Sequence, residues 1–80
     1  MSKNIIVTGG AQGIGKIISQ QLLKKGYKVS VLEIDSEAIN EFRDENPSED
    51  LFFSRCDVSS QPEVQKAIDE VVNKFNRIDG

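Results

Sequence analysis

The spacing of hydrophobic residues changes along this 80-residue chain, and the changes predict alternating strands and helices. Short apolar runs predict strands at 4–8, 29–32 and 51–54, and a continuous β-branched run is typical of a parallel strand covered on both faces. Residues at helical spacing lie between and after these runs: Ile14, Ile17, Ile18, Leu22 and Leu23, then Ala38, Ile39 and Phe42, then Val64, Ala67, Ile68, Val71, Val72 and Phe75. The order βαβαβα predicts half of a doubly wound α/β sheet.

Residues typical of helix ends support these ranges. Gly26 is suited to stop the first helix, which runs over 14–25. Asp35 or Ser36 is suited to cap the second helix, and Asn46-Pro47 to end it. The run 60–63, Ser-Gln-Pro-Glu, predicts a capping box at the start of the third helix.

Composition narrows the class of protein. The net charge of −3 and the scattered lysines argue against a nucleic-acid partner, and no apolar run is long enough for a membrane span. The segment 1–4 leads directly into a strand, so we expect no signal peptide and a cytoplasmic location. With one cysteine, Cys56, and no histidine, we expect neither a disulfide nor a metal site.

A glycine-rich stretch between the first strand and first helix predicts a phosphate cradle. This glycine turn, residues 9–15, reads Gly-Gly-Ala-Gln-Gly-Ile-Gly and leads into a helix N-terminus, where unpaired N–H groups favour an anion. The strict motif G-x-G-x-x-G fails at Ile18. The phosphate loop of magnesium-dependent nucleotide hydrolases fails at Ile17, which has no hydroxyl, so it remains a minor alternative.

The pattern T-G-x-x-x-G-x-G is met in full from Thr8 to Gly15. Together with an acid after the second strand, the Cys56-Asp57-Val58 step and the closing residues 77–80, it resembles the N-terminal half of a short-chain dehydrogenase/reductase. This resemblance implies a Rossmann fold and an NAD(P)-dependent oxidoreductase that transfers hydride between nicotinamide cofactor and an alcohol or carbonyl substrate.

The resemblance assigns roles within the glycine turn. Gly9 permits the sharp turn, Gly13 brings bare backbone to the pyrophosphate, and Gly15 lets the helix approach the first strand. The hydroxyl of Thr8 is expected to brace the turn, and the backbone of Ile14 to meet the cofactor.

The acid after the second strand is Glu33, which is expected to accept hydrogen bonds from the adenosine ribose. Gln12 and Ile34 stand at the two positions where NADP-dependent members of the family carry basic residues. Gln12 is also one of the expected cofactor contacts. The lack of a basic residue at these two positions, together with the repulsion between Glu33 and a 2′-phosphate, favours NAD over NADP. The family usually has Asp at the position of Glu33. Asp35 is a second candidate for the ribose-binding acid. The alternative interpretation of Glu33 is an exposed acid at a strand end with no role in binding.

Two residues after the third strand complete the expected site. Asp57 resembles the family aspartate that binds the adenine amino group, and Val58 supplies backbone and apolar contact. The alternative for Asp57 is a carboxylate that only caps a turn. Cys56 is interpreted as a small buried residue, and Gly10 as a residue of the turn alone.

The family's chemistry uses an Asn-Asn-Ala-Gly stretch, a serine and a Tyr-x-x-x-Lys pair, and none is present. The single tyrosine, Tyr27, has Val31 four places on. We therefore predict no catalytic residue, and any small-molecule substrate belongs to a complete protein. A non-catalytic nucleotide-binding or interaction module of 80 residues is the alternative function.

The expected topology follows from right-handed crossovers. They give strand order 3-2-1, with the first two helices on one face and the third on the other. Residues 1–80 would then form an incomplete Rossmann domain that stops before strand four. This leaves the run 5–7 as an unpaired apolar edge, which is a candidate surface for self-association.

Overall fold

Three parallel strands form the centre of the fold in the computed structural model, which describes residues 3–80. The strands are β1 (Asn4–Thr8), β2 (Lys28–Glu33) and β3 (Leu51–Arg55), and the helices are α1 (Gly13–Lys24), α2 (Ser36–Glu45) and α3 (Gln61–Phe75). β2 lies between the other two strands, in register with both. The predicted elements and the strand order are confirmed. The expectation that no signal peptide is present concerned segment 1–4, and residues 1–2 of that segment lie outside the described residues.

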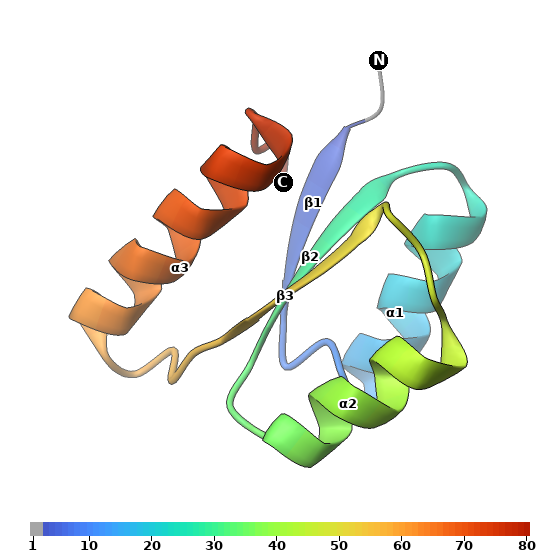
Figure 1. Cartoon of the computed structure of the whole chain (residues 1–80), viewed down its shortest axis with the longest axis horizontal. Helices are drawn as coiled ribbons and strands as arrows, with labels where there is room; N and C mark the ends of the chain where they lie inside the picture. Colours follow the sequence, from blue (N-terminus) through green and yellow to red (C-terminus); the bar gives the residue numbers. More distant parts are fainter. Residues whose placement is uncertain (1–2) are drawn as a thin grey trace.

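The sheet separates two apolar clusters, and β2 contributes to both. Val29 and Val31 are fully buried on the face that α1 and α2 cover, together with Phe42 of α2. Leu32 points to the other face, where it packs with Val71 of α3. Figure 1 shows α3 on one side of the sheet and both other helices on the opposite side. The expected doubly wound arrangement is therefore present.

The inner face of α1 differs from the prediction. The three isoleucines of the predicted apolar stripe are exposed: Ile14 at 78%, Ile17 at 59% and Ile18 at 46%. Ser19 is fully buried instead, and Leu22 and Leu23 pack only partly against the core. Small residues face the sheet because α1 approaches it closely at its first turns, which leaves the larger isoleucines on the outer side.

Of the predicted helix caps, the one at the start of α2 is present and the capping box at the start of α3 is not. The Asp35 carboxylate caps α2, accepting from the N–H groups of Glu37 at 3.0 Å and Ala38 at 3.2 Å. Ser60 is the N-cap of α3, but its side chain forms no capping hydrogen bond. The predicted capping box is wrong because Glu63 instead accepts from the Asp57 N–H at 3.3 Å, outside the helix.

The C-terminal residues return to the free edge of β1. The Asp79 N–H donates to the Asn4 carbonyl at 2.8 Å, and the Ile6 N–H donates to the Gly80 carbonyl at 2.7 Å. The Asp79 carboxylate accepts from the Asn4 N–H and from the Arg77 guanidinium. The expectation of an unpaired edge over 5–7 is therefore wrong at Ile6, because the chain pairs with its own first strand.

These contacts predict acid sensitivity. Hydrogen bonds from Arg77 and from the Asn4 backbone lower the pKa of Asp79 below its usual range. Its contribution to stability is complete above about pH 5 and is lost as the pH falls through the lowered pKa, below about 3.9. We expect Asp79→Asn to lower the urea midpoint at pH 7 and to have a smaller effect at pH 3. Asp44→Asn, at an exposed residue of α2, is the control, and an equal effect of Asp79→Asn at both pH values would contradict the assignment.

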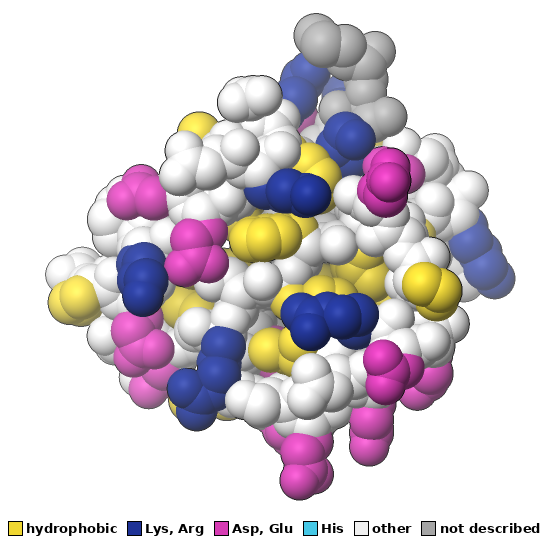
Figure 2. All heavy atoms as spheres, viewed as in Figure 1, with side chains coloured by type: hydrophobic (Ala, Val, Ile, Leu, Met, Phe, Trp, Pro, Cys, Tyr) yellow, Lys and Arg dark blue, Asp and Glu magenta, His cyan; other side chains and the backbone are white. Residues whose placement is uncertain are grey.

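The surface carries both charges. Figure 2 shows Lys and Arg interspersed with Asp and Glu on the face seen in Figure 1. Within residues 3–80 no helix combines the length and apolarity that a bilayer crossing requires.

Candidate functional site at the carboxyl ends of the strands

The glycine turn has the backbone conformation that glycine permits. Gly9 and Gly13 have positive φ angles, 64° and 57°, and a Cβ at either would meet no atom within 4 Å. Both positions are therefore strained for other residues and open to an approaching group. Gly15 is the reverse case: a Cβ there would collide with the Gly9 carbonyl oxygen and lie 2.9 Å from the carbonyl carbon.

Gly10 lies in the turn, as expected, and it also has a packing role. Its φ angle is not positive, and a Cβ would lie 2.9 Å from Ser19 Oγ and 3.0 Å from a methyl of Val7. The Ser19 hydroxyl contacts the carbonyls of Gly10 and Gly15 at 3.2 and 2.9 Å. This contact joins the turn to α1 and explains why a serine is buried there.

The N-terminus of α1 carries donors without partners. Gln12 is the N-cap and has extended backbone, but its side chain does not cap the helix. The first turn contains no acidic residue, and within residues 3–80 the N–H groups of Gly13, Ile14 and Gly15 form no hydrogen bond. These donors and the helix dipole favour an anion at this point.

Glu33, at the end of β2, is buried with 4% of its surface exposed, which excludes the alternative of an exposed acid. Its Oε1 accepts from the Ala11 N–H at 3.4 Å. Its Oε2 accepts from the N–H groups of Ile34 at 3.2 Å and Asp35 at 3.3 Å, and from the Gln12 amide at 3.3 Å. The carboxylate thus connects the glycine turn with the β2–α2 junction.

Asp57 follows β3 and closes a turn, as its alternative reading expects. Its Oδ1 accepts from the Ser59 N–H at 2.9 Å and the Ser59 hydroxyl at 2.6 Å. These bonds lower the pKa of Asp57 below its usual range. Asp57 as a residue is half-buried and its hydrogen bonds with Ser59 are exposed, so its structural role in the turn leaves part of the carboxylate accessible.

A pocket of about 130 Å³ brings several predicted residues together; we call it the strand-end pocket. It is lined by Gly9, Leu32, Glu33, Ile34, Cys56, Asp57 and Val58. Four of the nine predicted site residues line it, although they come from three separate strand ends. Ile34 and Val58 expose 52% and 55% of their surfaces, so aliphatic side chains accompany the two carboxylates. Sequence reasoning did not propose Ile34 as a contact; its place directly after Glu33, at the end of an apolar run, was the available signal.

The other predicted residues lie around this pocket. Gln12 and Gly13 line a neighbouring depression of about 240 Å³, together with Ala11, Lys16, Asp35, Glu37, Ala38 and Glu41. We call it the acidic depression, because its one cation, Lys16, is paired with Glu45 of α2 at 3.2 Å. Thr8, Ile14 and Gly15 line neither, although Thr8 and Ile14 are exposed on either side of the glycine turn.

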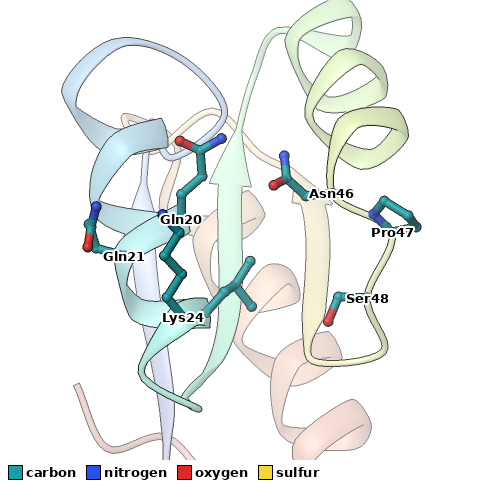
Figure 3. Close-up of a pocket in the computed structure, with 7 residues that line it drawn as sticks. Gln20, Gln21, Lys24, Asn46, Pro47 and Ser48 are labelled. Atoms are coloured by element: carbon teal, nitrogen blue, oxygen red, sulfur yellow. The ribbon is translucent and has the colours of Figure 1, made fainter.

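A third pocket, of about 400 Å³, lies at the opposite ends of the strands. Figure 3 shows amide and hydroxyl side chains from the end of α1 and the α2–β3 connection around it, among them Gln20, Asn46 and Ser48. Both helices end here, so their unpaired groups are carbonyls and not N–H donors. Because ligands of parallel α/β sheets bind at the carboxyl ends of the strands, we assign no site to this pocket.

Cys56 lies under the strand-end pocket with 2% of its surface exposed. Burial raises the pKa of its thiol, and the nearby carboxylates of Glu63, Asp57 and Glu70 raise it further. It therefore behaves as a small buried residue rather than a nucleophile. Residues 3–80 contain no cluster of three potential metal ligands.

Comparison with known proteins shows which family this sequence matches. The sequence profile of the short chain dehydrogenases matches residues 3–80. The chain is 42% identical to sorbitol-6-phosphate 2-dehydrogenase of Klebsiella pneumoniae over 76 residues, which are 95% of this chain and 27% of that protein. Solved structures with similar folds include an apo SCOR enzyme from Clostridium thermocellum (35% identity, TM-score 0.89, 99% of this chain and 32% of that one). ElxO with NADP bound is also similar (33% identity, TM-score 0.86, 99% of this chain and 33% of that one). The chain spans about a third or less of these relatives.

Proposed function

Because this chain belongs to the short chain dehydrogenase family, we propose that it forms the NAD(H)-binding part of an oxidoreductase and holds the adenosine and pyrophosphate half of the cofactor. Members of this family use NAD(P). The observation that carries the proposal is the strand-end pocket, where Gly9, Glu33, Asp57 and Val58 meet beside the unpaired N–H groups of α1.

The residues present fit a dinucleotide. The open space at Gly9 and Gly13 admits a pyrophosphate, and the N-terminus of α1 supplies donors for it. Glu33 offers a carboxylate to the ribose, while Ile34 and Val58 offer exposed aliphatic surface to a flat base. The accessible part of the Asp57 carboxylate is suited to accept from an adenine amino group. Thr8 and the backbone of Ile14 lie beside the turn and would be available to the cofactor.

Electrostatics favour NAD(H) over NADP(H). The acidic depression beside Gln12 carries the carboxylates of Asp35, Glu37 and Glu41, and its lysine is paired. A 2′-phosphate would meet these charges as well as Glu33, and the lysine that lines the depression is already paired with Glu45. Family membership alone does not decide the question, since ElxO has NADP bound.

When bound, the nicotinamide would supply hydride transfer. The residues of this chain bind and orient the other half of the cofactor, and the 80 residues contain no His and no Tyr-x-x-x-Lys pair. Substrate recognition and acid–base chemistry are accordingly assigned to the remainder of a complete family member.

Calorimetric titration of the purified chain with NADH and NADPH tests the proposal. We expect NADH to bind at least about tenfold more tightly, because one more phosphate faces like charges. ADP should compete fully with NADH, since the proposed site covers the ADP half. Equal or tighter binding of NADPH would overturn the NAD(H) preference, and absence of binding by both would overturn the site.

A further inference from the structure

The carboxylate of Glu33 has one oxygen with more donors than it can serve well. Three N–H groups converge on Oε2, from the backbone of Ile34 and Asp35 and from the Gln12 amide. The two oxygens of a carboxylate offer about four acceptor positions in total, or about two each. A hydroxyl that approaches Oε2 would therefore be a fourth donor to an already crowded oxygen, unless it takes the place of one of the three.

Oε2 is the oxygen that a ligand would reach. The hydrogen bond of Oε1 with the Ala11 N–H is buried, whereas those of Oε2 are only partly buried. Glu33 also lines the strand-end pocket. A ribose in that pocket would consequently meet the more accessible Oε2.

Of the three donors, only Gln12 is free to move. The N–H groups of Ile34 and Asp35 are held by the β2–α2 junction, where the Asp35 carboxylate caps α2. The Gln12 side chain is exposed and does not cap α1, and among residues 3–80 its hydrogen-bond partner is Glu33 alone. Rotation of its side chain costs one hydrogen bond of 3.3 Å and no rearrangement of the backbone.

We propose that the Gln12 side-chain amide is an internal competitor for the ribose: it occupies the acceptor position of Glu33 Oε2 and must leave before a ribose hydroxyl binds there. The inference rests on the proposed nucleotide site and adds a residue that weakens binding. Gln12 thus opposes adenosine binding through Glu33 rather than contributing a favourable contact, and the ligand group that displaces it is the vicinal diol of the ribose.

Nucleotides with and without this diol test the proposal. We expect Gln12→Ala to bind ADP about 2- to 10-fold more tightly than the wild type, the range of one net hydrogen bond. Its affinity for 2′,3′-dideoxy-ADP should equal that of the wild type, since no hydroxyl then competes with Gln12. Gln12→Asn, too short to reach Glu33, should behave like Gln12→Ala. Gln21→Ala, an exposed glutamine at the other end of α1, should change neither affinity.

Two kinds of result would contradict the proposal, and they differ in whether the nucleotide site survives. Weaker binding of ADP by Gln12→Ala, or an equal change for both nucleotides, would overturn the competition while leaving the nucleotide site intact. In ¹H–¹⁵N spectra of the wild type, ADP should shift the side-chain amide signals of Gln12, and dideoxy-ADP should not. If neither ADP nor NADH binds the wild type, the proposed function itself fails, and this inference fails with it.

Discussion

Gly15→Ala is expected to destabilise the chain more than any other single methyl group added to the glycine turn. Its Cβ would collide with the Gly9 carbonyl oxygen and lie 3.0 Å from the Gly10 Cα. These are backbone atoms of the turn, so no side-chain rotation relieves the contact. We expect a loss of about 3 kcal/mol, at the upper end for overpacking, or roughly 12–24 °C in melting temperature for a chain of this size.

Gly13→Ala is the matched control, two residues earlier in the same turn. Its Cβ would meet no atom within 4 Å, and its cost comes only from the positive φ angle of 57°. This conformation costs an alanine about 1–2 kcal/mol. Thermal unfolding of the three proteins by circular dichroism makes the comparison. If Gly15→Ala melts no lower than Gly13→Ala, the close approach of α1 to the turn is not as described.

The second large effect concerns Glu33. Glu33→Ala removes the acceptor of three backbone N–H groups, those of Ala11, Ile34 and Asp35. Unsatisfied buried donors cost about 1–3 kcal/mol each, and water entering the vacated space reduces the sum, so we expect a loss of about 2–4 kcal/mol. A lost charged hydrogen bond should also weaken NADH binding by roughly 10- to 150-fold.

Urea unfolding and calorimetric titration together separate the two roles of this carboxylate. Glu41→Ala, at an exposed acid on the nearby helix α2, should change the free energy of unfolding by less than about 0.5 kcal/mol. If Glu33→Ala reduces stability while leaving NADH affinity unchanged, Glu33 is a structural acid only. If it leaves stability unchanged, the hydrogen bonds around the carboxylate do not form.

Local patterns were sufficient for most elements of the fold. Continuous apolar runs and helical spacing located every strand and helix, because burial on both faces and amphipathic packing each impose a period on the sequence. Asp35 was correctly placed as the cap of α2, since the signal lies within a few residues. Ser60 and Glu63 also matched a capping pattern, but Glu63 bonds instead with Asp57, a partner that local spacing does not reveal.

The exposed isoleucines of α1 show where periodicity fails. A helical stripe identifies residues that share a face, but not which neighbour covers that face. Gly10, Gly15 and Ser19 bring α1 close to the sheet, so small residues occupy the buried side and Ile14 lies in solvent. The pairing of Asp79 and Gly80 with β1 was missed for a related reason: it joins residues more than seventy positions apart.

The sequence by itself determined the doubly wound order of elements, the glycine turn and the acid after β2, because each depends on residue types at short and regular spacing. Only the tertiary structure decided how these parts meet. Parallel strands bring their carboxyl ends to one edge, which places Gly9, Glu33 and Asp57 around one pocket. The Gln12 amide reaches Glu33 across 21 positions, and that contact depends on how closely α1 approaches the sheet.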